Sequence, residues 1–460
     1  MGEDTIAAIA TAPGEAGIGI VRISGDKSID IAESIFKGKT EEKLSKVDER
    51  KLVYGHIIDP KDQSKIDEVL TVYMKGPFTY TKEDIVEINC HGGIIPVRRI
   101  LELVLEKGAR MAEAGEFTKR AFLNGRIDLA QAEAVMDLIS AKTDTSFDVS
   151  LNQLEGSLSK EVKNIRDVIL EIIAHIEASI DFPEDDIENV AYDKIEQKGK
   201  KVLTKIDELL KTSSTGKILR EGLKTVILGK PNVGKSSLLN SILRENRAIV
   251  TDVPGTTRDI IEEYVNVNGI PLKIIDTAGI RETDDVVEKI GVNKAKNLLN
   301  ESDLAIVIFD GSRDLTDEDK EIMKLIKDRK AIILINKTDL EEKINKREIE
   351  KYLPNKEIIA TSILKGSGLD ILEDTLKEMF FSGDIKIKDD VIVSNVRHKE
   401  LLNKAKQNIK EALESLNMGM PIDCIEVDIK DCWSNLGEIN GDTVSEDIID
   451  KIFEDFCIGK

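Results

Sequence analysis

The sequence predicts a multidomain α/β protein in which a P-loop α/β domain is inserted into an α-helical domain that follows an N-terminal α+β domain. Three observations lead to this prediction. A glycine-rich phosphate-binding motif, residues 229–236, stands between a strand-like apolar run and a helical pattern. β-Branched runs fill the first hundred residues, and helical spacing of apolar residues occurs on both sides of the P-loop segment.

Residues 1–119 are expected to form the α+β domain. Four β-branched runs bounded by Gly, Pro or Asp predict strands, and residues 95–106 have the apolar spacing of a helix. The predicted strands are residues 18–23, 51–58, 68–74 and 84–89.

Residues 120–214 are expected to form the first part of the helical domain. Asp128 and Gln131 begin a helix with the pattern of a capping box. Apolar residues from Leu154 to Ile180 recur at spacings of three, four and seven, which predicts one face of a long helix that ends at Asp181-Phe-Pro183.

Residues 381–460, which end in Cys-Ile-Gly-Lys, are expected to form the second part of the helical domain. Two further helical patterns, 397–416 and 442–456, are too short to build a core of their own. We therefore expect them to pack against residues 120–214, and a separate C-terminal domain is the alternative.

The P-loop motif Gly229-Lys-Pro-Asn-Val-Gly234-Lys235-Ser236 predicts a nucleoside triphosphate site in a domain of residues 215–380. Its glycines let backbone N–H groups surround the β-phosphate at a helix N-terminus. Lys235 can reach the β- and γ-phosphates, and the hydroxyl of Ser236 suits Mg²⁺.

Two later motifs identify the base as guanine. Asp276-Thr-Ala-Gly279 follows a strand-like run and places a carboxylate near Mg²⁺ and a glycine amide near the γ-phosphate. In Asn336-Lys-Thr-Asp339, the Asp339 carboxylate can accept both donors of the guanine Watson–Crick edge, while the stem of Lys337 covers the base. The sequence therefore predicts a GTP hydrolase.

The hydrolytic machinery is expected to be unusual. Position 280, where Ras-type enzymes carry a water-positioning glutamine, is Ile280. Asn232 can hold a monovalent cation in place of an arginine finger, and Glu288 is a candidate for orienting the water or, alternatively, a solvated helix residue. Residues 251–259 have the pattern of switch I, with Thr257 as a second hydroxyl on Mg²⁺. The expected GTP-binding residues are Gly229, Asn232, Val233, Gly234, Lys235, Ser236, Ser237, Thr251, Asp252, Val253, Pro254, Gly255, Thr256, Thr257, Asp276, Thr277, Ala278, Gly279, Asn336, Lys337, Asp339 and Ser362.

The composition is typical of a cytoplasmic protein without a membrane span. No apolar run approaches the roughly 20 residues that a span needs. The four cysteines form no CxxC pair, and the acidic N-terminus lacks the basic residues of a leader. A net charge of −21 argues against non-specific nucleic-acid binding, because phosphate contacts need clustered Lys and Arg.

Several segments together resemble the MnmE (TrmE) family of tRNA-modification GTPases, and the resemblance covers essentially the whole chain. These segments are residues 17–24, 90–93, 115–125, 128–134, 255–259 and 456–460. The resemblance implies an N-terminal domain that binds a tetrahydrofolate derivative and mediates homodimerisation, a discontinuous helical domain and an inserted GTPase. The departures are Arg126, where a lysine can occur, and Ser362-Ile-Leu364 in place of Ser-Ala-Arg or Ser-Ala-Lys.

The resemblance also implies a potassium-activated GTPase. With an FAD-dependent MnmG-type partner, in a heterotetramer, it would install a carboxymethylaminomethyl-type group at C5 of the wobble uridine of certain tRNAs. The carbon would come from a reduced folate, 5-formyl- or 5,10-methylene-tetrahydrofolate. The implied ligands are Ser236 and Thr257 for Mg²⁺, Asn232, Thr251, Val253 and Thr256 for K⁺, Glu288 for water, and Arg22, Glu87, Arg126 and Lys460 for folate.

Each folate residue has a structural alternative. Arg22 and Glu87 could form an ordinary surface ion pair, and Lys460 could belong to a loose terminus. Cys457 is either a reactive thiol near the folate site or a buried inert one. For the whole chain, the alternative is a regulatory GTPase switch in ribosome assembly. Such a switch usually adds a KH domain or a second GTPase, and the sequence contains neither pattern.

Overall fold

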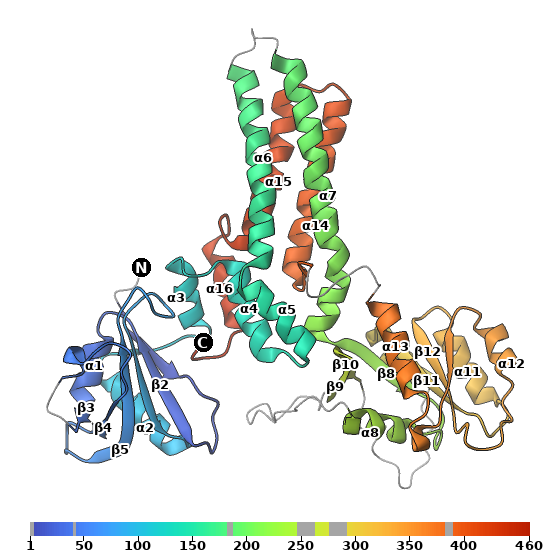
Figure 1. Cartoon of the computed structure of the whole chain (residues 1–460), viewed down its shortest axis with the longest axis horizontal. Helices are drawn as coiled ribbons and strands as arrows, with labels where there is room; N and C mark the ends of the chain where they lie inside the picture. The colour runs from blue at the N-terminus through green and yellow to red at the C-terminus, as the bar shows by residue number, and fades with distance from the viewer. Residues whose placement is uncertain (1–3, 40–42, 182–186, 246–262, 276–291, 382–389) are drawn as a thin grey trace. The chain divides into compact units, whose positions relative to one another are not determined.

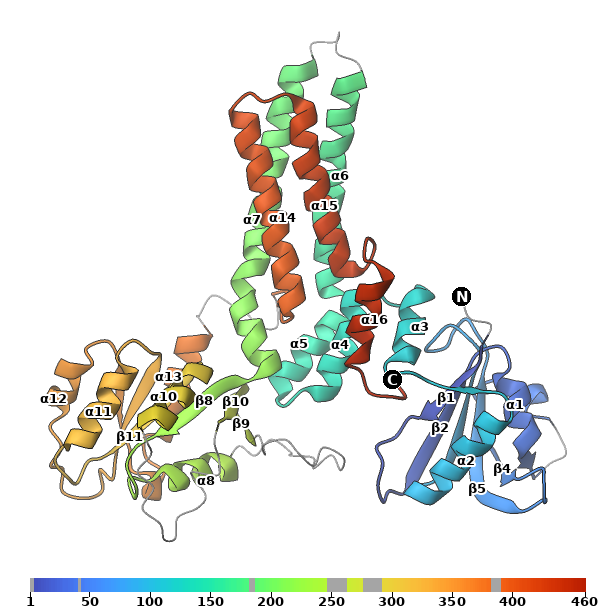
Figure 2. The same ribbon diagram turned by 180° about the vertical axis from the view of Figure 1, so that it is seen from behind.

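The computed structural model describes residues 4–39, 43–181, 187–245, 263–275, 292–381 and 390–460. The chain forms two compact units, each described separately below. One contains residues 1–136 and 437–460, and the other contains most of residues 137–436. Figures 1 and 2 show the elements of both units. In the described ranges, no helix is long and apolar enough to cross a membrane.

The first unit is built on a seven-stranded sheet with the order β3-β4-β5-β6-β2-β1-β7. Neighbouring strands are antiparallel except for β1 and β7. The helices α1 (Ser28–Ile35) and α2 (Ile94–Glu106) pack on one face and share a single apolar core with it (Figure 2). The strands are β1 (Ile6–Ile9), β2 (Ile18–Ser24), β3 (Phe36–Gly38), β4 (Val53–Ile58), β5 (Lys65–Met74), β6 (Ile85–His91) and β7 (Arg110–Met111).

The four predicted strands correspond to β2, β4, β5 and β6, and the predicted helix corresponds to α2. These predictions are confirmed. The strand β1 was not predicted, because it has only four residues and two of them are alanine. It nevertheless pairs with both β2 and β7 and is almost completely buried.

Three helical segments complete the first unit: α3 (Glu116–Leu123), the first part of α4 (Leu129–Ser140) and α16 (Glu446–Glu454). One apolar cluster joins them, and the ammonium of Lys119 pairs with Asp450 at 2.5 Å. The cluster consists of Ala121, Ile127, Leu129, Ala132, Ile449, Phe453 and Phe456. The helix α16 thus packs against residues between Ala121 and Ala132, which lie inside the predicted partner range of 120–214.

The second unit contains four long helices that lie side by side, with the short helix α5 (Asp144–Leu154) at one end of them (Figures 1 and 2). The long helices are α6 (Ser157–Asp181), α7 (Ile187–Glu221), α14 (Val396–Asn417) and α15 (Ile422–Asn440). The helix α7 contacts both α6 and α14. The guanidinium of Arg166 lies 4.1 Å from the ring centroid of Trp433, which joins α6 to α15. The alternative of a separate C-terminal domain is therefore wrong.

The predicted long helix is divided in the structure. Leu154 is the last residue of α5, and α6 begins at Ser157. Between them, Gly156 has a φ of +89°, a left-handed conformation that ends a helix. The spacing of four between Leu154 and Leu158 continues the helical period across this break, so the periodicity does not reveal it. The helix α6 ends at Asp181, as predicted.

The P-loop domain in the second unit has a six-stranded sheet with the order β13-β12-β11-β8-β10-β9. Only β9 is antiparallel to its neighbour, and it joins β10 through Asn268 and Gly269, whose φ values are +50° and +88°. Asn-Gly is a dipeptide typical of a two-residue β-hairpin turn, because both residues tolerate positive φ. Separate apolar clusters on the two faces of the sheet pack against α8 and α13 and against α10, α11 and α12. The strands are β8 (Leu223–Leu228), β9 (Glu263–Val267), β10 (Ile270–Ile274), β11 (Leu304–Asp310), β12 (Ala331–Asn336) and β13 (Glu357–Ala360), and the helices are α8 (Lys235–Glu245), α10 (Val292–Glu301), α11 (Asp317–Ile326), α12 (Lys346–Tyr352) and α13 (Leu369–Phe380).

Close contacts fix the P-loop sheet to the helices of the second unit. The Thr143 hydroxyl at the start of α5 donates to the carbonyl oxygen of Gly269 at 3.0 Å. The Ser146 hydroxyl donates to the carbonyl oxygen of Leu219 at 2.7 Å. In α7, a Cβ added at Gly216 would lie 2.2 Å from the carbonyl oxygen of Val393, so the chain that returns from the P-loop domain passes directly over this glycine.

We predict that Gly216→Ala destabilises the protein, because backbone atoms of Val393 must move to admit the methyl group. Overpacking of this kind costs about 1 to 3 kcal/mol. The apparent melting temperature of the full chain, followed by circular dichroism, should fall. The control is Thr204→Ala on the exposed side of the same helix, which should leave it unchanged or higher. Equal melting temperatures for Gly216→Ala and the parent would contradict the close packing.

Candidate functional site

The P-loop connects the buried strand β8 to the N-terminus of α8. Three of its residues have positive φ values: Gly229 (+151°), Asn232 (+63°) and Gly234 (+111°). Such conformations let successive backbone N–H groups form a concave anion site at a helix N-terminus. A Cβ at Gly234 would lie 2.4 Å from the amide nitrogen of Asn336, so this position has room only for glycine.

The side chain of Lys235 is held above the loop. Its ammonium donates to the carbonyl oxygens of Gly229 at 2.9 Å and Lys230 at 2.8 Å. Ser236 and Ser237 follow it in the first turn of α8, where backbone N–H groups point out of the end of the helix. The positive charge, the hydroxyls and the helix N-terminus therefore meet at one place, and together they suit a polyphosphate.

Asn336 links residues 336–339, the predicted guanine-binding motif, to the P-loop. Its Nδ2 donates to the carbonyl oxygen of Val233 at 2.8 Å, and its Oδ1 accepts from the backbone N–H of Ile363 at 3.0 Å. The residue is buried at the end of β12. Both ends of this amide are engaged with backbone groups, so Asn336 holds three loops in a fixed relation to one another.

The carboxylate of Asp339 is also held in place. Its Oδ1 accepts a hydrogen bond from the Ser362 hydroxyl at 2.7 Å, and this bond lowers the pKa of Asp339 below its usual value. The carboxylate therefore stays charged at neutral pH. Lys337, with a φ of +67°, donates from its ammonium to Asp310 at 2.8 Å. The structure thus brings the P-loop, residues 336–339 and Ser362 to the same edge of the sheet.

The remaining predicted residues of this site lie outside the described residues. They are Thr251, Asp252, Val253, Pro254, Gly255, Thr256, Thr257, Asp276, Thr277, Ala278, Gly279 and Glu288.

A second group of predicted residues meets in the first unit. Arg22 on β2 and Glu87 on β6 are paired in the strand register, and their side chains join at 2.8 Å. The side chains are only 18% and 21% exposed, so the pair is shielded from water more than an ordinary surface ion pair. A terminal nitrogen of Arg22 also donates to the carbonyl oxygen of Gly459 at 3.4 Å, which places the C-terminal segment beside the pair.

The C-terminal segment is fixed to the first unit by backbone contacts. Ile458 forms an antiparallel bridge with Ala114, and the N–H of Gly115 donates to the carbonyl oxygen of Cys457. The N–H of Lys460 donates to the same oxygen at 3.3 Å. Lys460 is therefore not part of a loose terminus. The thiol of Cys457 is exposed, so the alternative of a buried thiol is wrong.

Tyr80 belongs to this second group, although sequence reasoning did not predict it. The guanidinium carbon of Arg126 lies 4.4 Å from the centroid of its ring, and that of Arg22 lies 5.9 Å away. The Tyr80 hydroxyl shares a hydrogen bond with Thr118 at 2.9 Å. One feature of the sequence could have identified Tyr80 as a candidate: it lies in a loop between two predicted strands, and binding residues are often found in loops. Arg22, Glu87 and Arg126 are thus connected, and Lys460 follows a residue that contacts Arg22.

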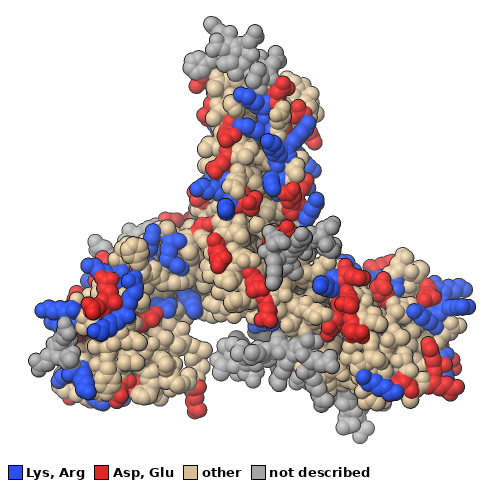
Figure 3. Space-filling model, in the orientation of Figure 1, with Lys and Arg blue, Asp and Glu red and all other residues tan. Residues whose placement is uncertain are grey.

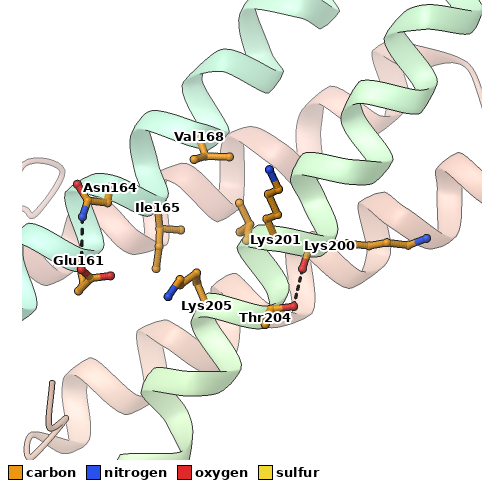
Figure 4. Close-up of a pocket in the computed structure, with 9 residues that line it drawn as sticks. Glu161, Asn164, Ile165, Val168, Lys200, Lys201, Thr204 and Lys205 are labelled. Atoms are coloured by element: carbon orange, nitrogen blue, oxygen red, sulfur yellow. Dashed lines mark hydrogen bonds between the residues drawn. The ribbon is translucent and has the colours of Figure 1, made fainter. Parts of the chain in front are cut away.

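A cavity of about 580 Å³ lies between α6 and α7 in the second unit (Figure 4). Figure 4 shows Lys201 and Lys205 beside Ile165 and Val168, and Asn164 donating to Glu161. None of the predicted site residues lines this cavity, so it is not the nucleotide site. Figure 3 shows Lys and Arg mixed with Asp and Glu over these helices, which keeps the local charge nearly balanced.

Comparisons with known proteins agree with this architecture. A family model described as GTP-binding protein TrmE N-terminus matches residues 5–126, and one described as MnmE helical domain matches residues 129–457.

Full-length relatives carry the same family name. The tRNA modification GTPase MnmE of Alkaliphilus oremlandii is 61% identical over 458 residues, which cover 100% of this chain and 99% of the relative. That of Clostridioides difficile is 57% identical with the same coverage. That of Bacillus licheniformis is 52% identical and covers 99% of this chain and 100% of its own length. The resemblance seen in the sequence is confirmed, and the chain belongs to the MnmE (TrmE) family of tRNA modification GTPases.

Proposed function

We propose that this chain is a potassium-activated GTPase that takes part in modification of the wobble uridine of certain tRNAs. The observation that supports the proposal is the pair of hydrogen bonds that join Asn336 to Val233 of the P-loop and to Ile363. These bonds hold the P-loop close to residues 336–339, as a site for the phosphates and the guanine of one nucleotide would require. The printed name of the relatives, tRNA modification GTPase, supports the same function.

In this proposal, different residues contact different parts of the bound nucleotide. Asp339 accepts the donors of the guanine edge, and Lys235 meets the β- and γ-phosphates. Ser236 has a hydroxyl in the first turn of α8 and would hold Mg²⁺ together with Thr257. When bound, Mg²⁺ would neutralise charge that develops on the phosphates. Asp276 and Gly279 are proposed to complete the shell around the γ-phosphate.

The proposed activation by potassium depends on Asn232. This residue is exposed in the P-loop and has a left-handed backbone, which suits a side chain that reaches toward bound phosphates. The carbonyl oxygens of Thr251, Val253 and Thr256 would supply the other K⁺ ligands. Glu288 would orient the attacking water, because Ile280 cannot replace the usual glutamine.

The second group of residues is proposed to bind a reduced folate. The Glu87 carboxylate suits the N–H groups of a pterin-like ring, and Arg22, Arg126 and Lys460 suit the glutamate carboxylates or the formyl group. Their shared position beside Gly459 and Tyr80 supports this assignment. Cys457 is an exposed thiol in the same segment and is a candidate for a reactive role.

The proposed homodimer would form through the first unit. The helices α1 and α2 cover one face of its sheet, while the opposite face carries exposed apolar side chains. Ile18 is 61% exposed, Leu70 is 42% exposed and Tyr54 is 40% exposed. An apolar patch of this kind favours contact with a second copy of the chain. Arg22 and Glu87 alternate with the buried residues of their strands, so they belong to this same face.

Each domain of the chain would have its own role. Residues 1–119 form the folate and dimerisation domain, residues 120–214 and 381–460 form one discontinuous helical domain, and residues 215–380 form the GTPase. An FAD-dependent MnmG-type protein would join the dimer in the cytoplasm and help to contact tRNA, since the net charge of −21 makes binding through the chain alone unfavourable.

We predict that Asp339→Asn weakens GTP binding roughly 10- to 100-fold, the loss expected when a hydrogen bond to a charged group is removed. An asparagine presents a donor to the guanine donors, so xanthosine triphosphate should bind this variant better than GTP does. Titration with both nucleotides measures the change. Unaltered GTP affinity would show that Asp339 does not contact the base.

We predict that GTP hydrolysis is faster in K⁺ than in Na⁺ at equal ionic strength, because K⁺ held by Asn232 would take the place of an arginine finger. Asn232→Ala should remove the difference between the two cations. Phosphate release under saturating GTP measures both rates. Equal rates in the parent protein would exclude a role for K⁺.

We predict that Arg22→Ala or Glu87→Ala weakens the binding of 5-formyltetrahydrofolate, measured by calorimetry, since each removes a charged partner from a shielded pair. In cells that lack this chain, the parent should restore the carboxymethylaminomethyl group on wobble uridines, measured by mass spectrometry, and either variant should not. GTP hydrolysis should persist in both variants. Normal wobble uridines without the chain would instead favour a ribosome-assembly switch.

A further inference from the structure

Tyr80 occupies an unusual position in the first unit. It packs against the cluster of Ile6, Ala8, Ala112 and Phe117 beside the sheet, and also against the helical cluster that contains Phe453 and Phe456. Its ring has the guanidinium groups of Arg22 and Arg126 within 6 Å of its centroid, at 5.9 Å and 4.4 Å. One aromatic ring therefore contacts both clusters and both arginines.

The loop that carries Tyr80 is held by hydrogen bonds on both sides. Thr81 shares a hydrogen bond with Ser24 on β2 at 2.7 Å. On the other side, the amide of Asn124 donates to the carbonyl oxygen of Thr81 at 2.7 Å, and Lys82 donates to the carbonyl oxygen of Asn124 at 2.8 Å. Asn124 lies two residues before Arg126. The loop thus fixes Tyr80 to the strand of Arg22 and to the turn of Arg126.

This arrangement has different consequences for the two arginines. Arg22 is already oriented by its ion pair with Glu87. Arg126 is exposed, and within the described part of the chain its guanidinium contacts the Tyr80 ring. A guanidinium near the face of an aromatic ring is attracted by the ring quadrupole. The ring therefore limits the conformations of a side chain that would otherwise be free to move in water.

We propose that Tyr80 is a positioning residue that orients Arg126, and secondarily Arg22, toward the anionic part of a reduced folate. The inference rests on the proposed folate site. A guanidinium that is oriented before binding loses less conformational freedom when the ligand arrives, so affinity rises without a new contact to the ligand. The face of the Tyr80 ring orients the guanidinium of Arg126, and the Tyr80 hydroxyl anchors the residue to Thr118.

The test is calorimetric binding of 5-formyltetrahydrofolate to the full chain and its variants. Tyr80→Leu should weaken binding roughly 3- to 30-fold, the range expected for loss of a cation–π contact. Tyr80→Phe keeps the ring and should stay within about twofold of the parent. The matched control is Phe78→Leu, which removes a ring that is 84% exposed on the same loop and should leave binding unchanged.

A second variant separates positioning from packing. Pentafluorophenylalanine at position 80 keeps the shape of the ring but reverses its quadrupole, so it should weaken binding as Tyr80→Leu does while melting like Tyr80→Phe. Combined with Arg126→Ala, Tyr80→Leu should cause little further loss, because residues that act through one contact are not additive.

The outcomes distinguish this inference from the proposed function. If the parent does not bind the folate, the folate site itself is wrong and the inference falls with it. If the parent binds and Arg22→Ala weakens binding, but pentafluorophenylalanine at position 80 binds as well as Tyr80→Phe, only the positioning role is overturned. Additive losses for Tyr80→Leu and Arg126→Ala would overturn it as well.

Discussion

The close approach of Gly459 to Ile9 is the constraint on which the first unit depends. Gly459 has a φ of +93°, and a Cβ at this position would lie 2.2 Å from the carbonyl oxygen of Ile9. The contact places the C-terminal segment against β1, beside Arg22 and the start of α3. This contact, together with the apolar cluster around Phe453, holds residues 437–460 in the same unit as residues 1–136, so the chain leaves this unit and returns to it. The helices are consequently built from two separated stretches of sequence, and the P-loop domain lies between those stretches.

Most of the fold could be predicted because its signals are local. The strands β11 and β12 are buried along their whole length and appear in the sequence as continuous apolar runs. The helix α15 was missed although Ile425, Ile429, Cys432, Leu436 and Ile439 are fully buried at helical spacing, because residues of low helix propensity such as Gly437 interrupt the pattern. The break before α6 could not be predicted from periodicity, since a glycine can stop a helix without changing the apolar spacing.

The two candidate sites differed in how much the sequence revealed. The P-loop and residues 336–339 are contiguous motifs, so their chemistry could be read directly. The role of Asn336 in tying them together could not, since it depends on backbone groups of Val233 and Ile363 that only the fold brings near. In the second site, Arg22 and Glu87 are 65 residues apart and came from a family resemblance rather than from spacing. Tyr80 was missed because Arg22 and Arg126 are distant from it in the sequence, and only the fold brings their guanidinium groups close to its ring.

The docking of the C-terminal segment can be tested with one substitution. Gly459→Ala forces a methyl group toward the carbonyl oxygen of Ile9 and should displace the segment from β1. Gly419→Ala is the matched control, since Gly419 also has a positive φ of +70° but has no atom within 4 Å of an added Cβ. In calorimetry with 5-formyltetrahydrofolate, Gly459→Ala should lose most of its affinity while Gly419→Ala binds like the parent. Parent-like affinity in Gly459→Ala would contradict the claim that the C-terminal segment completes the proposed folate site.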